Sequence, residues 1–406
     1  MTDAILVLNG GSSSLKFAVF EASNELPVLL RGNVSSLGRH PRLHAAAAVG
    51  FPEIDRGLGN GPIDVAKAFA TVASLLANRD LLARIDRVGH RIVHGGRDFT
   101  EATLLDGHTL ETLRLLEPLA PIHQRINLEI VALAAELLPQ ALQIGCFDTA
   151  FHSGRPELAK IYGLPRELTE AGILSYGFHG LSYGHIASKL HERYGASAGG
   201  RVIVAHLGSG ASLCALDAGR SVATTMGFST LDGLVMSTRC GALDPGVVLH
   251  LLQDRKLPAD ELVTLLYEKS GLLGVSGLSG DMRTLIGSDE PAAAEAIALF
   301  VYRIGREIGS LAAALGGLDR LVFTAGIGEN APSIRERIGA AAGWLGVAID
   351  KDRNRRADEI ISLADSGVDV LVIPTDEERA VGSQLLEASS STRARPRFML
   401  PSARRH

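Results

Sequence analysis

The chain has 406 residues, which is too long for one ordinary hydrophobic core, so two domains are expected. Hydrophobic residues make up 46% of it and charged residues only 21%, and its 45 glycines with few aromatic residues favour an α/β chain over an all-helical one. The formal net charge of -5 gives no electrostatic case for nucleic acid as a partner.

The cysteines and the apolar segments indicate the compartment. Cys146, Cys214 and Cys240 lie far apart and form no CxxC pair, so neither a zinc site nor a disulfide framework is indicated. The N-terminal MTDAILVLNGG has no basic segment before its apolar run, unlike a signal peptide. Charged residues interrupt the apolar stretch 296–315, which argues against a membrane span. We therefore expect a cytoplasmic protein with no membrane or nucleic-acid partner.

The first predicted elements are two strands joined by a turn of small residues, in LVLNGGSSSLKFAVF (residues 6–20). Leu15, Phe17 and Val19 alternate with residues of the opposite face, which is the period of a strand. The turn therefore joins strand to strand as a hairpin. This differs from a P-loop, which ends in Gly-Lys-Ser/Thr and opens directly into a helix.

Helical and extended patterns alternate after this hairpin. Apolar spacing predicts helices over residues 64–85 and 110–138, and strands over 87–96 and 141–152. The segment 201–222, RVIVAHLGSGASLCALDAGRSV, then repeats the hairpin design with a turn of His, Gly and Ser. Two hairpins built alike and far apart suggest two similar halves that face each other across a cleft.

The last part of the sequence is mostly helical. Helices are predicted over residues 244–254, 260–271 and 292–315. The third has an apolar stripe at Ile297, Val301, Ile304, Ile308 and Leu311. Residues 318–338 predict a strand, a glycine-rich turn and a helix, and residues 368–387 predict a strand, an acidic turn and a helix. The arginine-rich segment 389–406 has little to bury and is expected to be a flexible basic tail.

Three glycine-rich turns follow apolar strands. NGGSSS, in the first hairpin, supplies N–H groups and hydroxyls for phosphate oxygens, and Lys16, two positions beyond Ser14, adds a charge. A tight hairpin of turn-forming residues is the alternative interpretation. HLGSG at 206–210 and TAGIGEN at 324–330 are placed alike, and the three together fit a nucleotide better than inorganic phosphate alone. In the third turn, Asn330 is expected to cap the next helix and leave N–H groups free.

Four residues at strand ends or between glycines are candidates for chemistry. Arg91 and Arg239 each lie at the end of an apolar segment beside glycine, where a guanidinium can clamp a carboxylate or a phosphoryl group. Asp148 ends an otherwise apolar strand, and His179 lies between aromatic residues and glycines. An ordinary surface arginine and a hydrogen-bonded core histidine are the alternatives.

Two further pairs of charged residues have two interpretations each. Asp281 and Arg283 are candidates for nucleotide contact, but a surface salt bridge explains them equally well. Glu377 and Glu378 could hold Mg²⁺ or begin a helix with favourable charge. Together these residues fit phosphoryl transfer, in which catalysis is mainly alignment and charge neutralisation. No HExxH motif, EF-hand loop or Ser/His/Asp relay competes with this interpretation.

The chain resembles the acetate, propionate and butyrate kinase family, within the actin, Hsp70 and sugar kinase superfamily, from Ile5 to about Leu386. Ten segments occur in the family's order: LNGGSSSLK, GHRIVHGG, FDTAFH, YGFHG, HLGSGAS, MGFSTLDGL, TRCGALDPG, SGDMR, TAGIGEN and IPTDEE. Together these motifs are highly specific.

The resemblance implies an α/β fold of two duplicated actin-like (ribonuclease H-like) domains with a cleft between them, assembled as a homodimer. The N-terminal domain would span residues 1–150 and include a C-terminal helix at about 378–388. The C-terminal domain would span 151–377, before the tail 389–406.

The implied activity is the reversible, ATP-dependent phosphorylation of acetate to acetyl phosphate by direct in-line transfer, with Mg²⁺, or alternatively Mn²⁺, as the metal. A propionate or butyrate kinase is the first alternative. A nucleotide-dependent binding or chaperone module is a more distant one, because the same scaffold also serves proteins that hydrolyse ATP to change shape.

The resemblance assigns site residues by motif. The implied catalytic residues are Arg91, which holds the carboxylate, Asp148, as acid/base or metal-organising carboxylate, and His179 and Arg239, which stabilise the phosphoryl group. The implied acyl site consists of Arg91, Val93, Ile122, His123, Phe178 and Thr230. The implied ATP contacts are Ser12, Ser14, Lys16, His206, Leu207, Gly208, Ser209, Gly210, Asp281, Met282, Arg283, Gly326, Ile327, Gly328, Glu329 and Asn330. Asn9 and Glu377 would support the metal.

Two departures from the family's motifs bear on specificity. Ser209 replaces the asparagine of HLGNG, so one amide contact to phosphate becomes a shorter hydroxyl. Thr230 stands where a proline usually lines the acyl pocket, which leaves the preferred acyl chain length open.

Overall fold

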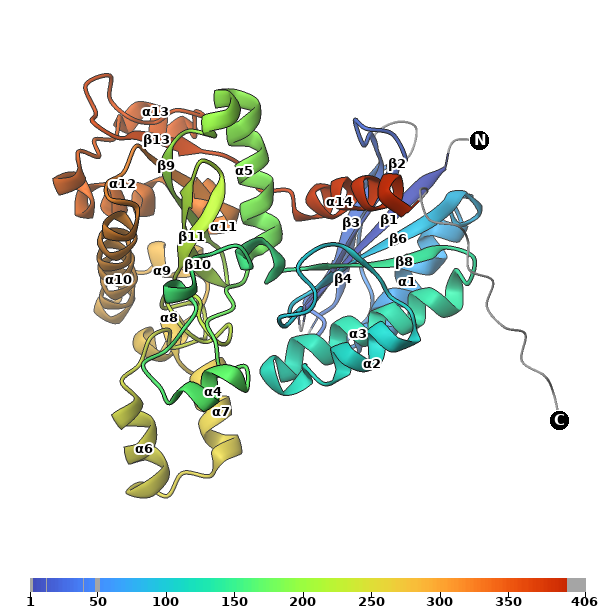
Figure 1. Cartoon of the computed structure of the whole chain (residues 1–406), viewed down its shortest axis with the longest axis horizontal. Coiled ribbons are helices and arrows are strands. Elements are labelled where there is room, and N and C mark those ends of the chain that lie inside the picture. Colours follow the sequence, from blue (N-terminus) through green and yellow to red (C-terminus); the bar gives the residue numbers. More distant parts are fainter. Residues whose placement is uncertain (1–2, 12, 39, 48–51, 393–406) are drawn as a thin grey trace.

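A computed structural model describes residues 3–11, 13–38, 40–47 and 52–392, which form the two lobes of Figure 1. The lobe on the right is built on an eight-stranded mixed sheet with the order β5-β4-β3-β2-β1-β6-β8-β7. Its strands are β1 (Ala4–Gly10), β2 (Ser14–Glu21), β3 (Val28–Ser35), β4 (Arg42–Ala47), β5 (Ile54–Gly57), β6 (Ile85–Ile92), β7 (Thr103–Leu104) and β8 (Leu142–Phe147). β1 and β2 form the predicted antiparallel hairpin, and β6 pairs with β1 in parallel.

Helices cover both faces of this sheet, so β1 is apolar on both sides. Leu6 and Leu8 belong to a core with α1 (Val65–Ala77) and α3 (Pro121–Leu137). Ile5 and Val7 point the other way and join a core with α14 (Glu377–Thr392). The end of the chain thus returns to the N-terminal sheet. The helix α2 (Gly107–Arg114) lies beside α3.

The second lobe, on the left of Figure 1, has a five-stranded sheet with the order β11-β10-β9-β12-β13. Its strands are β9 (Arg201–Leu207), β10 (Ala211–Asp217), β11 (Arg220–Thr224), β12 (Arg320–Thr324) and β13 (Asp369–Val372). One face packs on α10 (Pro291–Leu315) and α12 (Pro332–Ala341), and the other on α5 (Gly180–Tyr194). The remaining α-helices are α4 (Arg166–Glu170), α6 (Pro245–Gln253), α7 (Ala259–Glu268), α8 (Gly271–Ser276), α9 (Met282–Ile286), α11 (Ala325–Asn330) and α13 (Lys351–Arg356).

The two sheets share one design. The strands β3-β2-β1-β6-β8 pair as antiparallel, antiparallel, parallel and parallel, and β11-β10-β9-β12-β13 follow the same order of directions. The first sheet adds β4 and β5 at one edge and β7 at the other. The predicted duplication of an α/β unit is therefore confirmed, as is the burial of the predicted apolar stripe on α10.

The start of α5 holds the two lobes close together. The Gly180 N–H donates to the carbonyl oxygen of Asp148 at 3.0 Å, and a Cβ at Gly180 would lie 2.1 Å from that oxygen. Only glycine permits this approach. On the same helix Leu181 packs into the core beneath α14, and the Ser182 hydroxyl is 2.9 Å from that of Thr375.

Two predicted helices are wrong in extent. The helix predicted over 64–85 ends at Ala77, because the chain turns through a left-handed residue, Asp80 with φ 53°, before β6 begins. The segment 110–138 is divided at Pro121, since the residue before a proline is driven out of the helical region, and Ala120 has φ -149° and ψ 63°. The predicted tail over 389–406 is wrong at its start, because α14 continues to Thr392, and its remainder from 393 onward lies outside the described residues.

The three cysteines are free thiols. Burial raises the pKa of the Cys146 thiol, and it raises the pKa of Cys214 to about 12, so both thiols stay protonated and unreactive. Within the described ranges, no helix combines the length and the apolar character that a membrane crossing requires.

We expect Phe300→Ala on α10 to lower the free energy of unfolding by about 3–5 kcal/mol, because Phe300 is 1% exposed and its loss leaves a cavity. Tyr302→Ala on the same helix is the matched control, since this aromatic side chain is 61% exposed. Chemical denaturation measures both changes. Equal losses in the two variants would contradict the assignment of this face to the core.

Candidate active site

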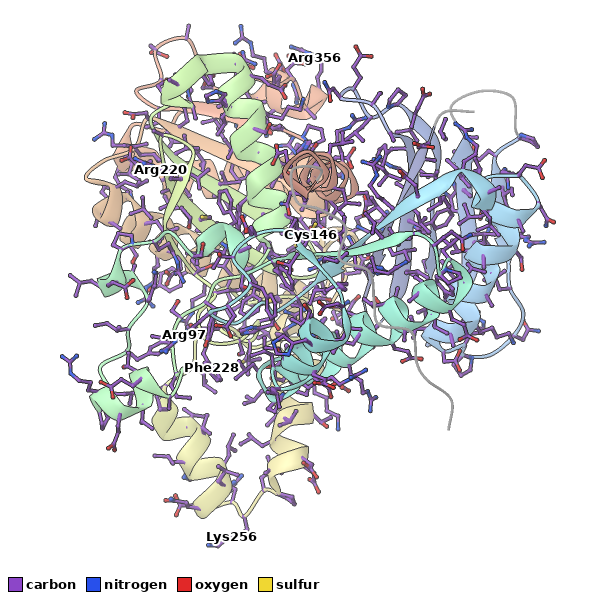
Figure 2. All side chains as sticks on the ribbon, turned by 45° about the vertical axis from the view of Figure 1, so that its right-hand side comes forward. Arg97, Cys146, Arg220, Phe228, Lys256 and Arg356 are labelled. Atoms are coloured by element: carbon purple, nitrogen blue, oxygen red, sulfur yellow. The ribbon has the colours of Figure 1, made fainter. Side chains whose placement is uncertain are left out.

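The N-terminal half of the candidate site is a chain of polar contacts between β1, β6, the end of β8 and the start of α14. The Arg91 guanidinium pairs with Asp148, with Nη2 2.6 Å from Oδ2 and Nε within 3.2 Å of both carboxylate oxygens. Arg91 Nη1 also donates to Asn9 Oδ1 at 3.1 Å. The Asn9 amide donates in turn to Glu377 at 2.9 Å and to Glu378 at 3.1 Å. Figure 2 shows Cys146, two residues before Asp148, at the boundary between the lobes.

Burial and opposite charge compete in this network. Burial disfavours an ionised Glu377, but the positive charge of Arg91, with smaller contributions that include Lys16, lowers its pKa to about 2. Asp148 is also buried, and burial raises its pKa although Arg91 opposes the rise. The carboxylates raise the pKa of Arg91 despite its burial, so this guanidinium is permanently charged.

The C-terminal half presents two stacked histidines. The rings of His179 and His206 lie 4.2 Å apart between centroids, at an angle of 25°. Nδ1 of His179 is 2.8 Å from the Ser212 hydroxyl, and Nδ1 of His206 is 2.8 Å from the Ser182 hydroxyl. Both rings are therefore fixed, with Nδ1 engaged and Nε2 left to face the site.

These imidazoles are neutral at physiological pH. Burial lowers the pKa of His206 to about 4, and burial with the charges of His206 and the arginines lowers the pKa of His179 well below its usual value. His179 precedes α5 with φ 58°, a left-handed conformation that is strained for a residue with a Cβ. Such strain is concentrated at functional sites, so it supports His179 as a candidate functional residue.

Arg239 adds a second guanidinium to the site. We call the region of Arg91, Arg239, His179 and His206 the positively charged corner. Arg239 reaches the site from the loop before α6, and its Nη1 donates to the Thr230 carbonyl at 2.8 Å. A Cβ built on Gly210 would lie 3.2 Å from His179 Nε2 and 3.7 Å from Arg239 Nη2, so all three groups converge. Burial and then the charge of Arg91 lower the pKa of Arg239.

His123 lies within the field of both guanidinium groups. Burial, followed by the charges of Arg239 and Arg91, lowers its pKa to about 4. Two guanidinium groups that repel each other beside neutral imidazoles create a site that an anion would stabilise.

Buried apolar residues line this corner. Val93 and Phe178 belong to one apolar core, and Thr230 is buried next to Arg239. His94, which was not predicted, has its ring centroid 5.6 Å from that of Phe178. Its Nδ1 accepts from the Gly96 N–H at 2.9 Å, whereas Nε2 has no partner among the described residues. The HGG sequence after Val93 is the only signal that could have indicated it. Of the predicted acyl residues, Ile122 has a side chain that the structure does not describe.

The second hairpin turn lies beside the two stacked histidines. The Gly208 N–H donates to the Gly210 carbonyl at 3.0 Å, and the Ser209 carbonyl accepts from the Ser237 N–H at 3.1 Å. A Cβ on Gly208 would lie 3.8 Å from that of Ala325, so this turn and the start of α11 are adjacent. Leu207, at the end of β9, is buried in the core.

Within the predicted glycine-rich turn at 324–330, residues Ala325–Asn330 form a short helix, α11, and Thr324 ends β12. The Glu329 carboxylate folds back to accept from the N–H groups of Ala325 and Thr375, at 2.8 and 3.1 Å. The predicted capping role of Asn330 is wrong: its amide donates to the Gly326 carbonyl, and Ala331 precedes α12. The Glu329 carboxylate favours the helical backbone because it satisfies the Ala325 N–H, one of the N–H groups that are free at the start of a helix.

Arg335 of α12 holds the end of this short helix and was not anticipated. The side chain is completely buried, and Nη1 donates to the carbonyls of Gly328 and Glu329 at 2.9 and 2.8 Å. Its remaining donors bind Asn354. Arg335 thereby keeps Gly326, Ile327 and their neighbours in place.

The other predicted nucleotide contacts are less closely tied to the histidines. Lys16 is exposed and pairs across the hairpin with Asn9, while Ser12 lies outside the described residues. Asp281 caps α9 by accepting from the Arg283 N–H at 2.7 Å, and the Arg283 side chain is 91% exposed. Met282 is buried in the core. The surface salt-bridge interpretation of the Asp281–Arg283 pair therefore stays open, at a separation of 3.8 Å.

The residues near Glu377 suit a hard divalent cation. Glu377 is ionised, and Glu378 and the Asn9 amide lie beside it. Within the described residues, no group of three or more His, Cys, Asp and Glu could hold a metal by itself. Mg²⁺ usually binds one or two carboxylates together with substrate phosphates and water, so this donor set fits it.

Comparison with known proteins identifies the family. The sequence matches the acetokinase family over residues 4–383. It is 51% identical to the acetate kinase of Rhodopseudomonas palustris (strain TIE-1) over 384 residues, which cover 93% of this chain and 96% of that one. The chain belongs to the acetokinase family. The chain is also 46% identical to the acetate kinase of Rhizobium meliloti over 399 residues, which cover 97% of this chain and 100% of that one.

Solved structures of acetokinase relatives share this fold. The acetate kinase of Porphyromonas gingivalis superposes with a TM-score of 0.82 at 35% identity and covers 95% of this chain and 99% of its own. A propionate kinase from Francisella tularensis superposes with a TM-score of 0.87 at 33% identity. The match covers 94% of this chain and 98% of that one. The resemblance inferred from the motifs is confirmed.

The neutral histidines make the stability of this acetokinase depend on pH. The pKa of His206 is about 4 in the folded protein and near 6.5 when unfolded, so the unfolded chain takes up the proton first. The stabilising effect is complete above pH 6.5 and is lost as the pH falls towards 4. Between pH 7 and pH 5, the free energy of unfolding should fall in both proteins. The fall should be about 2 kcal/mol smaller in His206→Gln, which lacks this imidazole, than in the wild type.

Urea denaturation at the two pH values measures this difference. His191→Gln, at an exposed position on α5, is the control and should follow the wild type. If His206→Gln and the wild type lose the same stability, His206 is not held neutral by burial.

Proposed function

We propose that this chain is an acetate kinase, which transfers the γ-phosphoryl group of Mg-ATP reversibly to acetate and forms acetyl phosphate and ADP. The curated relatives named above act on acetate by name. The observation that carries the proposal is the convergence of Arg91 and Arg239 on neutral histidines beside an ionised Glu377. Such a site suits an anionic acceptor and a phosphoryl group in transit.

In this proposal the positively charged corner aligns the two anions. Arg91, fixed by Asp148, holds the acetate carboxylate, and one carboxylate oxygen attacks the γ-phosphorus as the bond to the ADP oxygen breaks. The attacking oxygen is already an anion, so the transfer requires no general base. Arg239 and His179 stabilise charge on the planar phosphoryl group, and neutral His179 can do so by donating from Nε2. Asp148 therefore acts as a positioning carboxylate.

Asn9 and Glu377 would hold Mg²⁺, with Glu378 adjacent. Bound there, the cation would neutralise phosphate charge. Lys16, Ser12 and Ser14 would contact the phosphates from the first hairpin. The turn from His206 to Gly210 would contact them from the second, and α9 and α11 would bind the rest of the nucleotide. The adjacency of Gly208 and Ala325 supports one continuous nucleotide surface.

The acyl pocket is proposed to lie among Val93, Ile122, His123, Phe178 and Thr230. A pocket discriminates one methylene by only about 1–3 kcal/mol, so propionate is a second substrate. The propionate kinase from Francisella tularensis, with its close structural likeness, favours this alternative specifically.

The proposed domains are residues 1–150 with the helix at about 378–388, and 151–377. They would close on the ligands about hinges near 148–154 and Pro374, because a phosphoryl donor must be shielded from water. The free cysteines support a cytoplasmic location.

The proposed activity is tested by incubating the protein with Mg-ATP and acetate, propionate or butyrate and trapping the acyl phosphate with hydroxylamine. We expect product with acetate, with propionate close behind. No product from any of the three acids would refute the proposal.

Variants of the two arginines separate this kinase from a nucleotide-dependent chaperone on the same scaffold. Arg91→Ala and Arg239→Ala should each lower kcat/KM for acetate by roughly 10²–10³-fold, through loss of carboxylate and transition-state contacts. Arg42→Ala, which removes an exposed arginine paired with Asp55, is the control. Unaltered ATP turnover in both site variants would favour the chaperone.

We also propose that the protein is a homodimer, joined through the projection formed by α6 and α7. Figure 2 shows Lys256 at the tip of this projection. α6 has the sequence PGVVLHLLQ, and no residue of it is buried. Leu249 is 53% exposed and Val263 of α7 is 48% exposed. Apolar helices left uncovered in one chain typically mark an interface.

Leu249→Glu should weaken self-association at least tenfold, because it places a charge in an apolar contact. Light scattering coupled to size exclusion measures the mass across a dilution series. Lys256→Glu, at the exposed tip, is the control. A monomeric wild type, or a Leu249→Glu dimer of unchanged affinity, would contradict this interface.

A further inference from the structure

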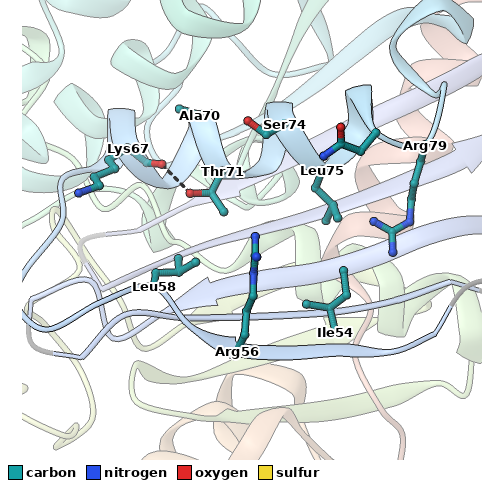
Figure 3. Close-up of a pocket in the computed structure, with 10 residues that line it drawn as sticks. Ile54, Arg56, Leu58, Lys67, Ala70, Thr71, Ser74, Leu75 and Arg79 are labelled. Carbon is teal, nitrogen blue, oxygen red and sulfur yellow. Dashed lines mark hydrogen bonds between the residues drawn. The ribbon is translucent and has the colours of Figure 1, made fainter.

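A groove lies in the N-terminal lobe between α1 and the edge strand β5, as Figure 3 shows. Its volume is about 550 Å³, within the range of sites that hold small organic ligands. Its lining consists of Ile54, Arg56, Leu58, Lys67, Ala70, Thr71, Ser74, Leu75, Asn78 and Arg79. None of these residues belongs to the candidate active site, so the groove is a separate feature.

Strand alternation directs Arg56 into the groove. Arg56 pairs with Leu43 of β4, and cross-strand partners share a face of the sheet. Leu43 is buried in the core that also contains α1, so the shared face is the one that looks towards α1. Figure 3 shows Arg56 extending from β5 towards the helix, with the apolar side chains of Ile54 and Leu58 on either side.

The same alternation keeps the carboxylates of this edge away from the groove. Glu53 and Asp55 occupy the opposite parity from Arg56, and both already have partners. Glu53 contacts His44 Nε2 at 2.6 Å, and Asp55 contacts Arg42 Nη2 at 2.8 Å. The positive charge of Arg56 is therefore not compensated from its own strand.

The helix adds further positive charge. α1 contains no acidic residue, and Lys67, Ser74 and Asn78 lie along its groove face. Figure 3 shows Lys67 at one end of the groove and the Arg79 guanidinium at the other, pointing towards β5. Asp64, just before α1, is the N-cap and accepts from the Lys67 N–H at 2.8 Å.

Two of the positive charges that line the groove, on Arg56 and Lys67, have no counter-charge within the described residues. Neither Arg56 nor the Lys67 ammonium makes an ion pair or a side-chain hydrogen bond within the described part of the chain. In a protein of net charge -5, cations gathered over an apolar floor without anions form a local positive potential. Guanidinium and ammonium groups together suit phosphate, and Leu58 and Leu75 offer an apolar surface to the rest of a ligand.

We propose that this groove binds a small organic phosphate at a site distinct from the active site. Arg56 and Lys67 bind the phosphate oxygens, and the carbon skeleton lies against Ile54, Leu58 and Leu75. An amphipathic phosphate ester matches both the charge and the apolar wall, whereas inorganic phosphate uses only the charge.

The probe is 1-naphthyl phosphate, titrated calorimetrically into the full-length protein saturated with Mg-ADP and acetate. We expect one binding event, an affinity that falls with salt, and at least tenfold weaker binding by the Arg56→Ala, Lys67→Ala double variant. Arg42→Ala on the other face of the sheet is the matched control and should bind as the wild type does. Arg239→Ala should also bind normally, which separates this site from the proposed catalytic one.

Arg42, Arg56 and Lys67 are exposed, so the thermal melts of their variants should match that of the wild type. An Arg56→Lys variant, which keeps the charge, should retain most of the affinity. Absence of binding by the wild type, unchanged binding by the double variant, or loss of binding in Arg239→Ala would each overturn the proposal.

Discussion

The buried contact between Arg91 and Asp148 is the constraint on which the site depends. A buried ion pair is stable only when geometry and further hydrogen bonds compensate its desolvation, and removal of one partner leaves an unpaired charge. Asn9 supplies one such bond and extends the network to Glu377. The network therefore ties the first strand of the chain to its last helix.

Several features of the fold follow from keeping that network closed. α14 must return to the N-terminal sheet so that Glu377 meets Asn9, and a core that includes Val381 and Leu385 holds it there. α5 must begin against the Asp148 carbonyl, which only glycine at position 180 permits. The helix α11 is bound to the same crossover, because Glu329 accepts from the Thr375 N–H.

The N-terminal and C-terminal halves of the site differ in how far they compensate the charge of their arginine. The N-terminal half compensates Arg91 with carboxylates, whereas Arg239 in the C-terminal half has only a backbone carbonyl as its hydrogen-bond partner among the described residues. The neighbouring histidines are kept neutral by burial, so they add donors without adding charge. The strain at His179 persists because Ser212 and the helix that follows fix its position. The groove at β5 lies outside this network, and there Arg56 and Lys67 also have no ion-pair partner among the described residues.

The sequence by itself determined the family, the two hairpins, the apolar stripe of α10 and most of the residues that meet at the site. These features depend on local periodicity, on glycine at turns and on motifs in a fixed order. The limits of the helices at Ala77 and Pro121 were less evident, because a left-handed residue and a proline effect act over only one or two positions. Only the tertiary structure decided that residues 325–330 are helical, where the Glu329 carboxylate accepts from the Ala325 N–H. It also decided that Arg335 is buried behind them, where its guanidinium donates to the Gly328 carbonyl. The tertiary structure also decided which charges have partners. Arg91 and Arg239 look alike in sequence, but Arg91 forms an ion pair with Asp148, more than fifty positions away, whereas Arg239 has only the Thr230 carbonyl as a hydrogen-bond partner among the described residues.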